Sequence, residues 1–235
     1  MSVLAFDTCL GACSVAVRAR GAGGDWQLHD RYVEMPTGHA EALMPMIEAV
    51  MEQADCEFSA LTRVAVTAGP GSFTGVRIGI AAARGFRLSL GIPVVTLTSF
   101  EVMAFRADML LASGPLALSR AGRALAVCVD ARNGQMFAQA FGTDVSEPLC
   151  EPMIGTPQML LAAVQGRSVI AVGSAGAAFA SAAREAGCEA VASLPGLLPH
   201  ARHLAILSDA GRAAEAPAPL YLREHDARPP AAAPA

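Results

Sequence analysis

The sequence predicts an α/β fold, in which helices flank sheets, and three observations indicate it. Short apolar runs rich in β-branched residues alternate with longer segments whose apolar residues recur every three or four positions. An apolar run that ends in aspartate and continues through a turn into a second strand occurs twice, at residues 4–17 and 126–141. A glycine-rich turn at residues 69–75 separates a strand-like run from a helix-like segment. The repeated pattern predicts two related parts.

The chain opens with three predicted strands that form an antiparallel meander. Residues 3–8 are an apolar run ending in Asp7 and Thr8, and residues 14–18 alternate two valines with smaller or polar residues. Residues 26–33 are more polar, so we expect this strand nearer the edge of its sheet.

Residues 39–54 form the clearest amphipathic helix. Pro45 fits best if this helix begins just before it or bends there. The apolar residues of the segment recur at steps of three and four: Leu43, Met46, Ile47, Val50, Met51 and Ala54.

The glycine-rich turn follows a predicted strand at residues 64–68 and leads into a helix at about residues 76–90. Gly69, Gly71 and Gly75 can take a positive φ or let another backbone approach closely. Ser72 and Thr74 are good helix caps whose hydroxyls could also donate to a phosphate. One interpretation is an anion site at a helix N-terminus; the other is only a tight connection. The spacing matches neither a Walker loop nor the dinucleotide-binding glycine pattern.

The second part has the same character. Ser99 is predicted to be the N-cap of its first helix, and Asn133-Gly134 indicates a hairpin. A loop is expected around residues 114–115, and residues 228–235 are expected to be disordered. Further strands are predicted at residues 93–98, 124–130, 135–141 and 169–172, and helices at residues 99–111, 176–186 and 203–211.

Composition narrows the class of protein. The 235 residues are 53% hydrophobic and only 16% charged, and all 17 basic residues are arginine. A net charge of −4 argues against a broad nucleic-acid surface. No apolar run is long enough for a membrane span, and no secretory signal is expected. The six scattered cysteines are typical of free thiols in a cytoplasmic protein.

Polar residues with catalytic or metal-binding chemistry are sparse. Asp7 and Asp130 end matching strands, where each could hold Mg²⁺ or cap the loop that follows. His39 lies four residues before Leu43, which cannot ligate, so a polar contact is the expected role of this histidine. His200 and His203 lack a third donor at suitable spacing. We therefore expect no metal site and no catalytic residue in this chain.

Several segments are similar to a known family. The hairpin at residues 4–17 resembles the first hairpin of the ASKHA superfamily, which includes acetate kinase, sugar kinases, Hsp70 and actin. The run at residues 69–79, Gly-Pro-Gly-Ser-Phe-Thr-Gly-Val-Arg-Ile-Gly, resembles the signature of the bacterial TsaB family, also called YeaZ. Residues 39–45, 129–132 and 219–223 agree with it too, in order along nearly the whole chain.

The resemblance implies an ASKHA fold with two related subdomains of mixed sheets flanked by helices. It implies subdomains at residues 1–98 and 99–223, followed by a tail at residues 224–235. TsaB-like proteins are scaffold subunits without catalytic residues, which act with TsaD and TsaE in the cytoplasm. That complex uses ATP and Mg²⁺ to place a threonylcarbamoyl group on N6 of the adenosine 3′ of the anticodon, in tRNAs that read codons starting with A. The other interpretations are an ATP-binding ASKHA enzyme, such as a small kinase, and a glycoprotease-like hydrolase.

Two sets of site residues follow from this interpretation. The candidate nucleotide- or anion-binding residues are Asp7, Thr8, Gly69, Gly71, Ser72 and Thr74. The candidate partner interface consists of His39, Leu43, Met46, Ile47, Val50, Gly75, Arg77, Gly79, Ala82 and Ala83. Association through this helical face predicts a homodimer of the isolated chain, competition with a TsaD homologue for the same face, and loss of pairing when charge is introduced at Val50 or Ala82. The same apolar residues could instead fill the core of this chain, and Arg77 and Arg84 could meet phosphate, an acidic partner or only water.

Overall fold

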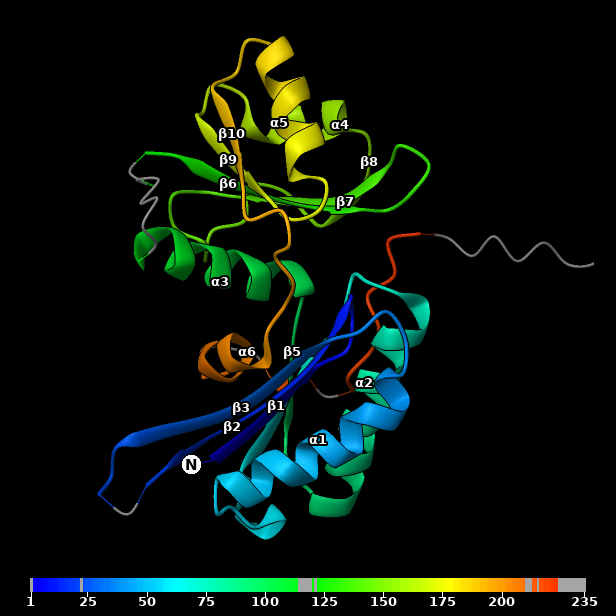
Figure 1. Ribbon diagram of the computed structural model, residues 1–235, viewed down its shortest axis with the longest axis vertical. Helices are drawn as coiled ribbons and strands as arrows, with labels where there is room; N and C mark the ends of the chain where they lie inside the picture. Colours follow the sequence, from blue (N-terminus) through cyan, green and yellow to red (C-terminus); the bar gives the residue numbers. More distant parts are fainter. Residues whose placement is uncertain are drawn as a thin grey trace, which may run out of the picture.

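The protein consists of two lobes, each built on one β-sheet (Figure 1). The computed structural model describes residues 2–21, 23–113, 120, 122–209, 213–214 and 216–223. The first sheet holds β1 (Ser2–Asp7), β2 (Ala12–Arg20), β3 (Trp26–Glu34), β4 (Arg63–Thr67), β5 (Val94–Leu97) and β11 (Ala213–Ala214). The second holds β6 (Ala124–Asp130), β7 (Met136–Phe141), β8 (Met153–Gly155), β9 (Val169–Val172) and β10 (Ala190–Ser193).

The two sheets share one topology. Their strand orders are β5-β4-β1-β2-β3 and β10-β9-β6-β7-β8, with β11 added at the edge of the first sheet. In both, the central strand pairs antiparallel with the next strand in sequence and parallel with the fourth. The repeat expected from residues 4–17 and 126–141 is therefore confirmed. All six residues of β1 are buried, because helices cover both faces of its sheet.

Helices α1 (His39–Gln53) and α2 (Phe73–Leu90) cover one face of the first sheet, and α6 (Ala201–Leu207) lies on the other (Figure 1). The apolar stripe of α1 packs on this sheet: Leu43, Met46, Ile47 and Val50 are at most 5% exposed. Pro45 lies inside the helix on its exposed side. Helix α1 begins at His39, six residues ahead of Pro45, so the expectation that it begins just before the proline is wrong.

The second sheet is covered by α3 (Ser99–Ser113) on the side of the first lobe and by α4 (Pro157–Leu161) and α5 (Gly176–Glu185) on the far side (Figure 1). The α3 side contributes Phe100, Met103 and Ala107 to a shared core. The far side is centred on Phe179 and Leu160. Two short 3₁₀ helices, at Phe58–Ala60 and Ala162–Val164, complete the described elements.

Residues 99–223 do not form one separate unit. Helix α6 packs on β1 and β2 of the first sheet through Ala201, Leu204 and Ala205. Strand β11 pairs with β5 of the same sheet. The last part of the chain therefore returns to the first lobe. Residues 114–115 and 224–235, where a loop and a tail were expected, lie outside the described residues.

The predicted helix caps differ in outcome, and Thr74 lies inside α2 rather than at its cap. Ser72 is confirmed as the N-cap of α2, because its Oγ accepts from the amide of Gly75 at 3.0 Å. The prediction for Ser99 is wrong. Thr98 and Glu101 form a capping box: Thr98 Oγ1 accepts from Glu101 N at 3.0 Å, and Glu101 Oε2 accepts from the Thr98 amide at 2.6 Å. Ser99 Oγ instead donates to the carbonyl of Pro70 at 2.6 Å, which ties α3 to the glycine-rich turn. None of the described helices is long and apolar enough to cross a membrane.

Candidate functional site

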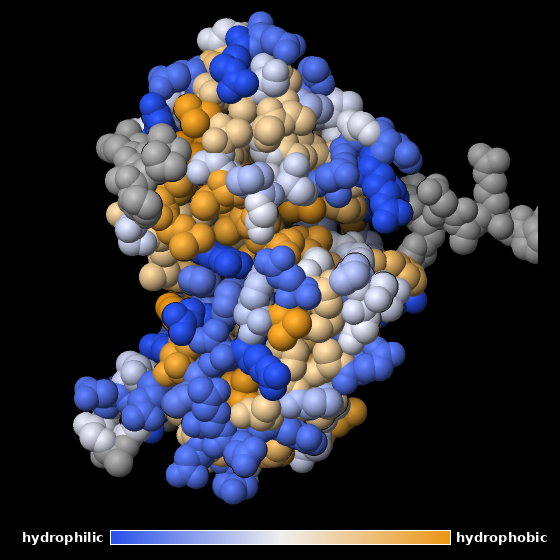
Figure 2. Space-filling model, in the orientation of Figure 1, coloured by the Kyte–Doolittle hydropathy of each residue, from blue (hydrophilic) through white to orange (hydrophobic). Residues whose placement is uncertain are grey.

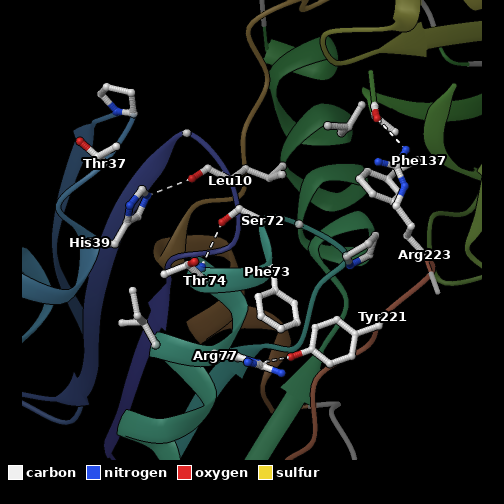
Figure 3. Close-up of a pocket in the computed structure, with 18 of the residues that line it drawn as sticks. Leu10, Thr37, His39, Ser72, Phe73, Thr74, Arg77, Phe137, Tyr221 and Arg223 are labelled. Atoms are coloured by element: carbon white, nitrogen blue, oxygen red, sulfur yellow. Dashed lines mark hydrogen bonds between the residues drawn. The ribbon is translucent and has the colours of Figure 1, made fainter. Parts of the chain in front are cut away.

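The candidate site is a cleft of about 1310 Å³ whose walls come from both lobes (Figure 3). The first lobe contributes the β1–β2 turn and the starts of α1 and α2, and the second contributes the β6–β7 turn. Residues 220–223 pass along the cleft between them. Apolar side chains gather along the waist between the lobes (Figure 2).

The glycine-rich turn packs directly on the β1–β2 turn. A Cβ at Gly71 would overlap the carbonyl oxygen of Cys9, and one at Gly75 would overlap the carbonyl oxygen of Thr8. The amide of Ser72 donates to Cys9 O at 2.7 Å, and Thr8 Oγ1 donates to Gly75 O at 2.7 Å. These glycines therefore allow close backbone packing. The Ser72 amide and the Gly75 carbonyl are already hydrogen-bonded within the protein, so they are not available to a ligand.

Only part of the predicted anion-binding set reaches the cleft. Gly71, Ser72 and Thr74 line it, and Ser72 and Thr74 are exposed there. Thr8 is 1% exposed and Gly69 is buried, so neither contributes to the wall. Gly69 takes a φ of 103°, and its carbonyl accepts from the amide of Ser99 at 2.8 Å.

Asp7 is wholly enclosed in the first lobe. Its Oδ1 accepts from Thr67 Oγ1 and, at 3.3 Å, from the amide of Cys9. Its Oδ2 has no hydrogen-bond partner among the described residues. Burial raises the pKa of this carboxyl, and the hydrogen bond from Thr67 opposes that rise. An interior carboxyl without access to the cleft cannot contact a ligand held there.

Asp130 occupies the equivalent place in the second lobe and is exposed in the cleft wall. Its Oδ1 accepts from the amide of Arg132 at 2.9 Å, so it caps the turn that follows, as Asp7 does with Cys9. The described residues contain no cluster of three His, Cys, Asp or Glu side chains that could hold a metal ion. The donor set around Asp7 and Asp130 thus does not fit the Mg²⁺–nucleotide site that the ASKHA fold would imply.

Arginine and aromatic side chains form one side of the cleft mouth (Figure 3). The Arg77 guanidinium carbon lies 3.5 Å from the centre of the Phe73 ring, and Arg77 Nε donates to the hydroxyl of Tyr221 at 2.8 Å. The rings of Phe73 and Tyr221 are 5.5 Å apart. Of these three residues, only Arg77 was a predicted site residue. Phe73 and Arg77 are at least 144 residues away from Tyr221 in the sequence. Their contact is therefore not visible in any short stretch of the chain.

The predicted partner interface lies mostly inside the protein. Leu43, Met46, Ile47, Val50 and Ala83 are core residues, and Gly75 and Gly79 are buried. Ala82 is half-buried, and Arg77 is exposed. The stripe on α1 is therefore corrected to a core face. His39 is also mostly buried, and its Nε2 donates to Leu10 O at 3.0 Å (Figure 3), the polar role expected for it.

His200 and His203 lie outside the cleft, between α6, α3 and β3. His200 stacks on Tyr32 with ring centres 4.8 Å apart, and His203 packs against Phe105. Burial lowers the pKa of each histidine to about 4, with Asp30 opposing the shift. Both are therefore neutral near pH 7 and act as packing residues in this arrangement.

Comparison with known proteins agrees with this architecture. Residues 34–176, more than half of the chain, match the family model described as TsaD, tRNA N6-adenosine threonylcarbamoyltransferase. The TsaB protein of Escherichia coli (strain K12), described as a tRNA threonylcarbamoyladenosine biosynthesis protein, is 31% identical over 144 residues, which cover 61% of this chain and 56% of that protein. The structure of YeaZ from Pseudomonas aeruginosa matches with a TM-score of 0.73 and 26% identity, covering 94% of this chain and 99% of that one. This chain belongs to the TsaB (YeaZ) family.

The structural match to YeaZ establishes the fold of this chain. The fold is the ASKHA-type α/β fold, because the structural match extends over both lobes. The TsaB protein of Bacillus subtilis (strain 168) is 30% identical over 104 residues, 44% of each protein. The matched region thus spans about half the length of these curated relatives.

Proposed function

We propose that this TsaB-family chain is a scaffold subunit without catalytic residues, which acts in N6-threonylcarbamoylation of the tRNA adenosine 3′ of the anticodon. In this proposal its partners in the cytoplasm are a TsaD homologue and a TsaE homologue, and tRNA reaches it only through the complex. ATP and Mg²⁺ are used by the complex. The observation that carries the scaffold role is the burial of Asp7, which leaves the carboxyl at the end of the first strand inside the lobe.

The proposed partner face is the exposed side of α1 and α2, in place of the buried stripe. We call it the α1–α2 outer face and define it by Met44, Glu48, Ala81, Arg84 and Leu88, all of which are exposed. Met44 is 43% exposed and Leu88 is 86% exposed, so this face presents two large apolar side chains to solvent.

Charge is separated between these two helices. Helix α1 carries three glutamates and no arginine, whereas α2 carries three arginines and no acidic residue. A two-fold arrangement would set α1 of one subunit against α2 of a related subunit, so that opposite charges face one another. This complementarity supports a homodimer of the isolated chain and replacement of one copy by a TsaD homologue of the same fold.

The scaffold role predicts that modification requires both proteins. We expect the TsaD homologue alone to be at least about tenfold slower than the TsaD homologue with this chain, when TsaE homologue, threonylcarbamoyl-adenylate and tRNA are present. The measurement is incorporation of labelled threonine into tRNA after copurification of the two proteins. Modification by this chain alone, or an equal rate without it, would contradict the proposal.

The outer face predicts a matched set of substitutions. Met44→Glu with Leu88→Glu should weaken the heterodimer by about 10- to 100-fold, because two apolar contacts are replaced by charge. Met159→Glu, at a residue 54% exposed on α4 of the other lobe, is the control and should have no effect. Sedimentation velocity with a thermal melt of each variant separates association from folding. An intact heterodimer in the folded double variant would place the interface elsewhere.

Charge introduced at Val50 is expected to act on folding, because Val50 belongs to the core face of α1. Val50 is 1% exposed, so Val50→Glu should lower the free energy of unfolding by about 3–5 kcal/mol and abolish pairing only through unfolding.

An ATP-dependent ASKHA enzyme is the second candidate, and the size of the cleft favours it over a glycoprotease-like hydrolase. Isothermal titration of the isolated chain with ATP and Mg²⁺ tests it. Micromolar binding with turnover would favour the enzyme over the scaffold.

A further inference from the structure

Residues 216–223 run along α2 and then between the two walls of the cleft (Figure 1). We call this segment the strap. It contains Tyr221 and Arg223, which lie at the cleft mouth in Figure 3. It contacts both lobes within eight residues, so its position bears on the distance between them.

Residues 217–221 of the strap are held by the first lobe. Arg84 Nε donates to Pro217 O at 2.9 Å, and Arg77 Nε donates to the Tyr221 hydroxyl at 2.8 Å. The amide of Leu220 donates to Ala68 O at 2.7 Å, beside the glycine-rich turn. Two of these three attachments are therefore side chains of α2.

The last two residues of the strap are held by the second lobe. Arg223 Nη2 donates to Ala131 O at 2.9 Å and to Gln135 Oε1 at 3.1 Å, and Leu222 packs against the core below the second sheet. These contacts attach the strap to the β6–β7 turn, which forms the second-lobe wall of the cleft. Within that turn Arg132 and Asn133 take φ values of 67° and 54°, a backbone conformation that non-glycine residues adopt at a cost.

The α2 attachments can be exchanged for stronger ones. Arg77 and Arg84 donate to a phenol and a carbonyl, and neither is in an ion pair with a described carboxylate. A carboxylate carries the opposite charge and can accept two parallel N–H bonds from one guanidinium, so it binds arginine more strongly than a phenol or a carbonyl does. A shallow hollow of about 400 Å³ lies between the two arginines, lined also by Ala81, Pro219 and Tyr221. A carboxylate from a docked protein has room to reach them there.

We propose that the strap is a clamp that holds the cleft walls together and that a partner's carboxylates release it by taking over Arg77 and Arg84. The clamp is a property of this chain alone, whereas the release rests on the proposed function. Freed from α2, the strap keeps only the Leu220–Ala68 hydrogen bond of the three described above, so it fixes the β6–β7 turn less firmly and the cleft widens. The two states differ by the bonds that each makes, as a shift in population requires.

The clamp is tested on the isolated chain by hydrogen–deuterium exchange. The reporter amides are those of Ala131 and Gln135, which close the β6–β7 turn. Arg77→Ala with Arg84→Ala changes only the first lobe, yet exchange of residues 129–136 should become at least about fivefold faster. Arg167→Ala, an exposed arginine elsewhere in the second lobe, is the control and should leave that exchange unchanged.

Two further variants keep this test decisive. Arg223→Ala removes the hydrogen bonds from the strap to Ala131 and Gln135 and should make exchange of the same amides faster. Tyr221→Phe removes one hydroxyl with little risk to folding and should give a smaller acceleration. Unchanged exchange of residues 129–136 in the folded Arg77/Arg84 variant would overturn the clamp.

The release is tested by adding the TsaD homologue to the wild-type chain. Exchange of residues 217–223 should become faster in the complex, although binding usually slows exchange. A complex in which these amides slow or stay unchanged would overturn the release and leave the proposed function standing. If no complex forms, the proposed function fails and the release fails with it, while the clamp is still decided by the variants.

Discussion

Gly75→Ala is expected to lower the free energy of unfolding by about 2–4 kcal/mol, a large effect for one added methyl group. The new Cβ would overlap the Thr8 carbonyl oxygen and lie 2.6 Å from Ser72 Oγ. The Thr8 oxygen belongs to the backbone of the β1–β2 turn, so it cannot move aside as a flexible side chain could. The start of α2 must shift, and the contact between the two turns is lost.

Gly85→Ala is the matched control for this prediction. Gly85 is in the same helix, is exposed, and has nothing within 4 Å of the position a Cβ would take. Alanine there should raise the free energy of unfolding by about 0.5–1 kcal/mol, because glycine is a poor helix former. Urea unfolding followed by circular dichroism measures both variants. Equal effects at the two positions would show that the approach of the turns does not constrain Gly75.

Asp7→Asn is expected to stabilise the protein by about 1–2 kcal/mol at pH 7.5. The amide oxygen can still accept from Thr67 and from the Cys9 amide, while the cost of burying a carboxylate is removed. The variant should retain its association with the TsaD homologue, because Asp7 is 0% exposed. Loss of tRNA modification in the folded, associated variant would show that the carboxyl has a functional role.

The pH dependence of this gain has a definite sign. Burial raises the pKa of Asp7, so the folded protein binds its proton more tightly than the unfolded chain. The wild type therefore loses stability as the pH rises from the ordinary value of 3.8 through the raised pKa. Asparagine does not titrate, so the difference between variant and wild type should shrink toward about pH 4 and grow above it. Paired urea titrations from pH 4 to 8 test this, and a pH-independent difference would contradict it.

Sequence patterns predicted the central strands and long helices because burial there dominates. β6 was predicted at its observed bounds, and the predicted repeat became two sheets of the same order. The short β8, β10 and α4 were not predicted, since three to five residues carry too little periodicity to be distinguished from loops. Ser99 shows a different limit. Thr98 and Ser99 are both good caps, and only the contact of Ser99 with Pro70 decides between them.

The candidate site was predicted only where it is local in sequence. Residues 69–79 were identified as one run, and residues 70–75, 77 and 78 of it line the cleft. The apolar stripe of α1 could not be assigned from its pattern, because a core face and a partner face have the same composition. The strap and the β6–β7 turn meet the glycine-rich turn only through the tertiary fold, so their shared role has no signal within any short stretch of sequence.

The common strand order of the two sheets has a consequence for the history of this protein. One ancestral half, duplicated and joined to itself, produces that order most simply, and the halves have since diverged unequally. The first half has a helix of 15 residues after its third strand, whereas the second has one of 5 residues in the corresponding place. In the proposed function, the helical surface for subunit recognition therefore lies in the half with the longer helix.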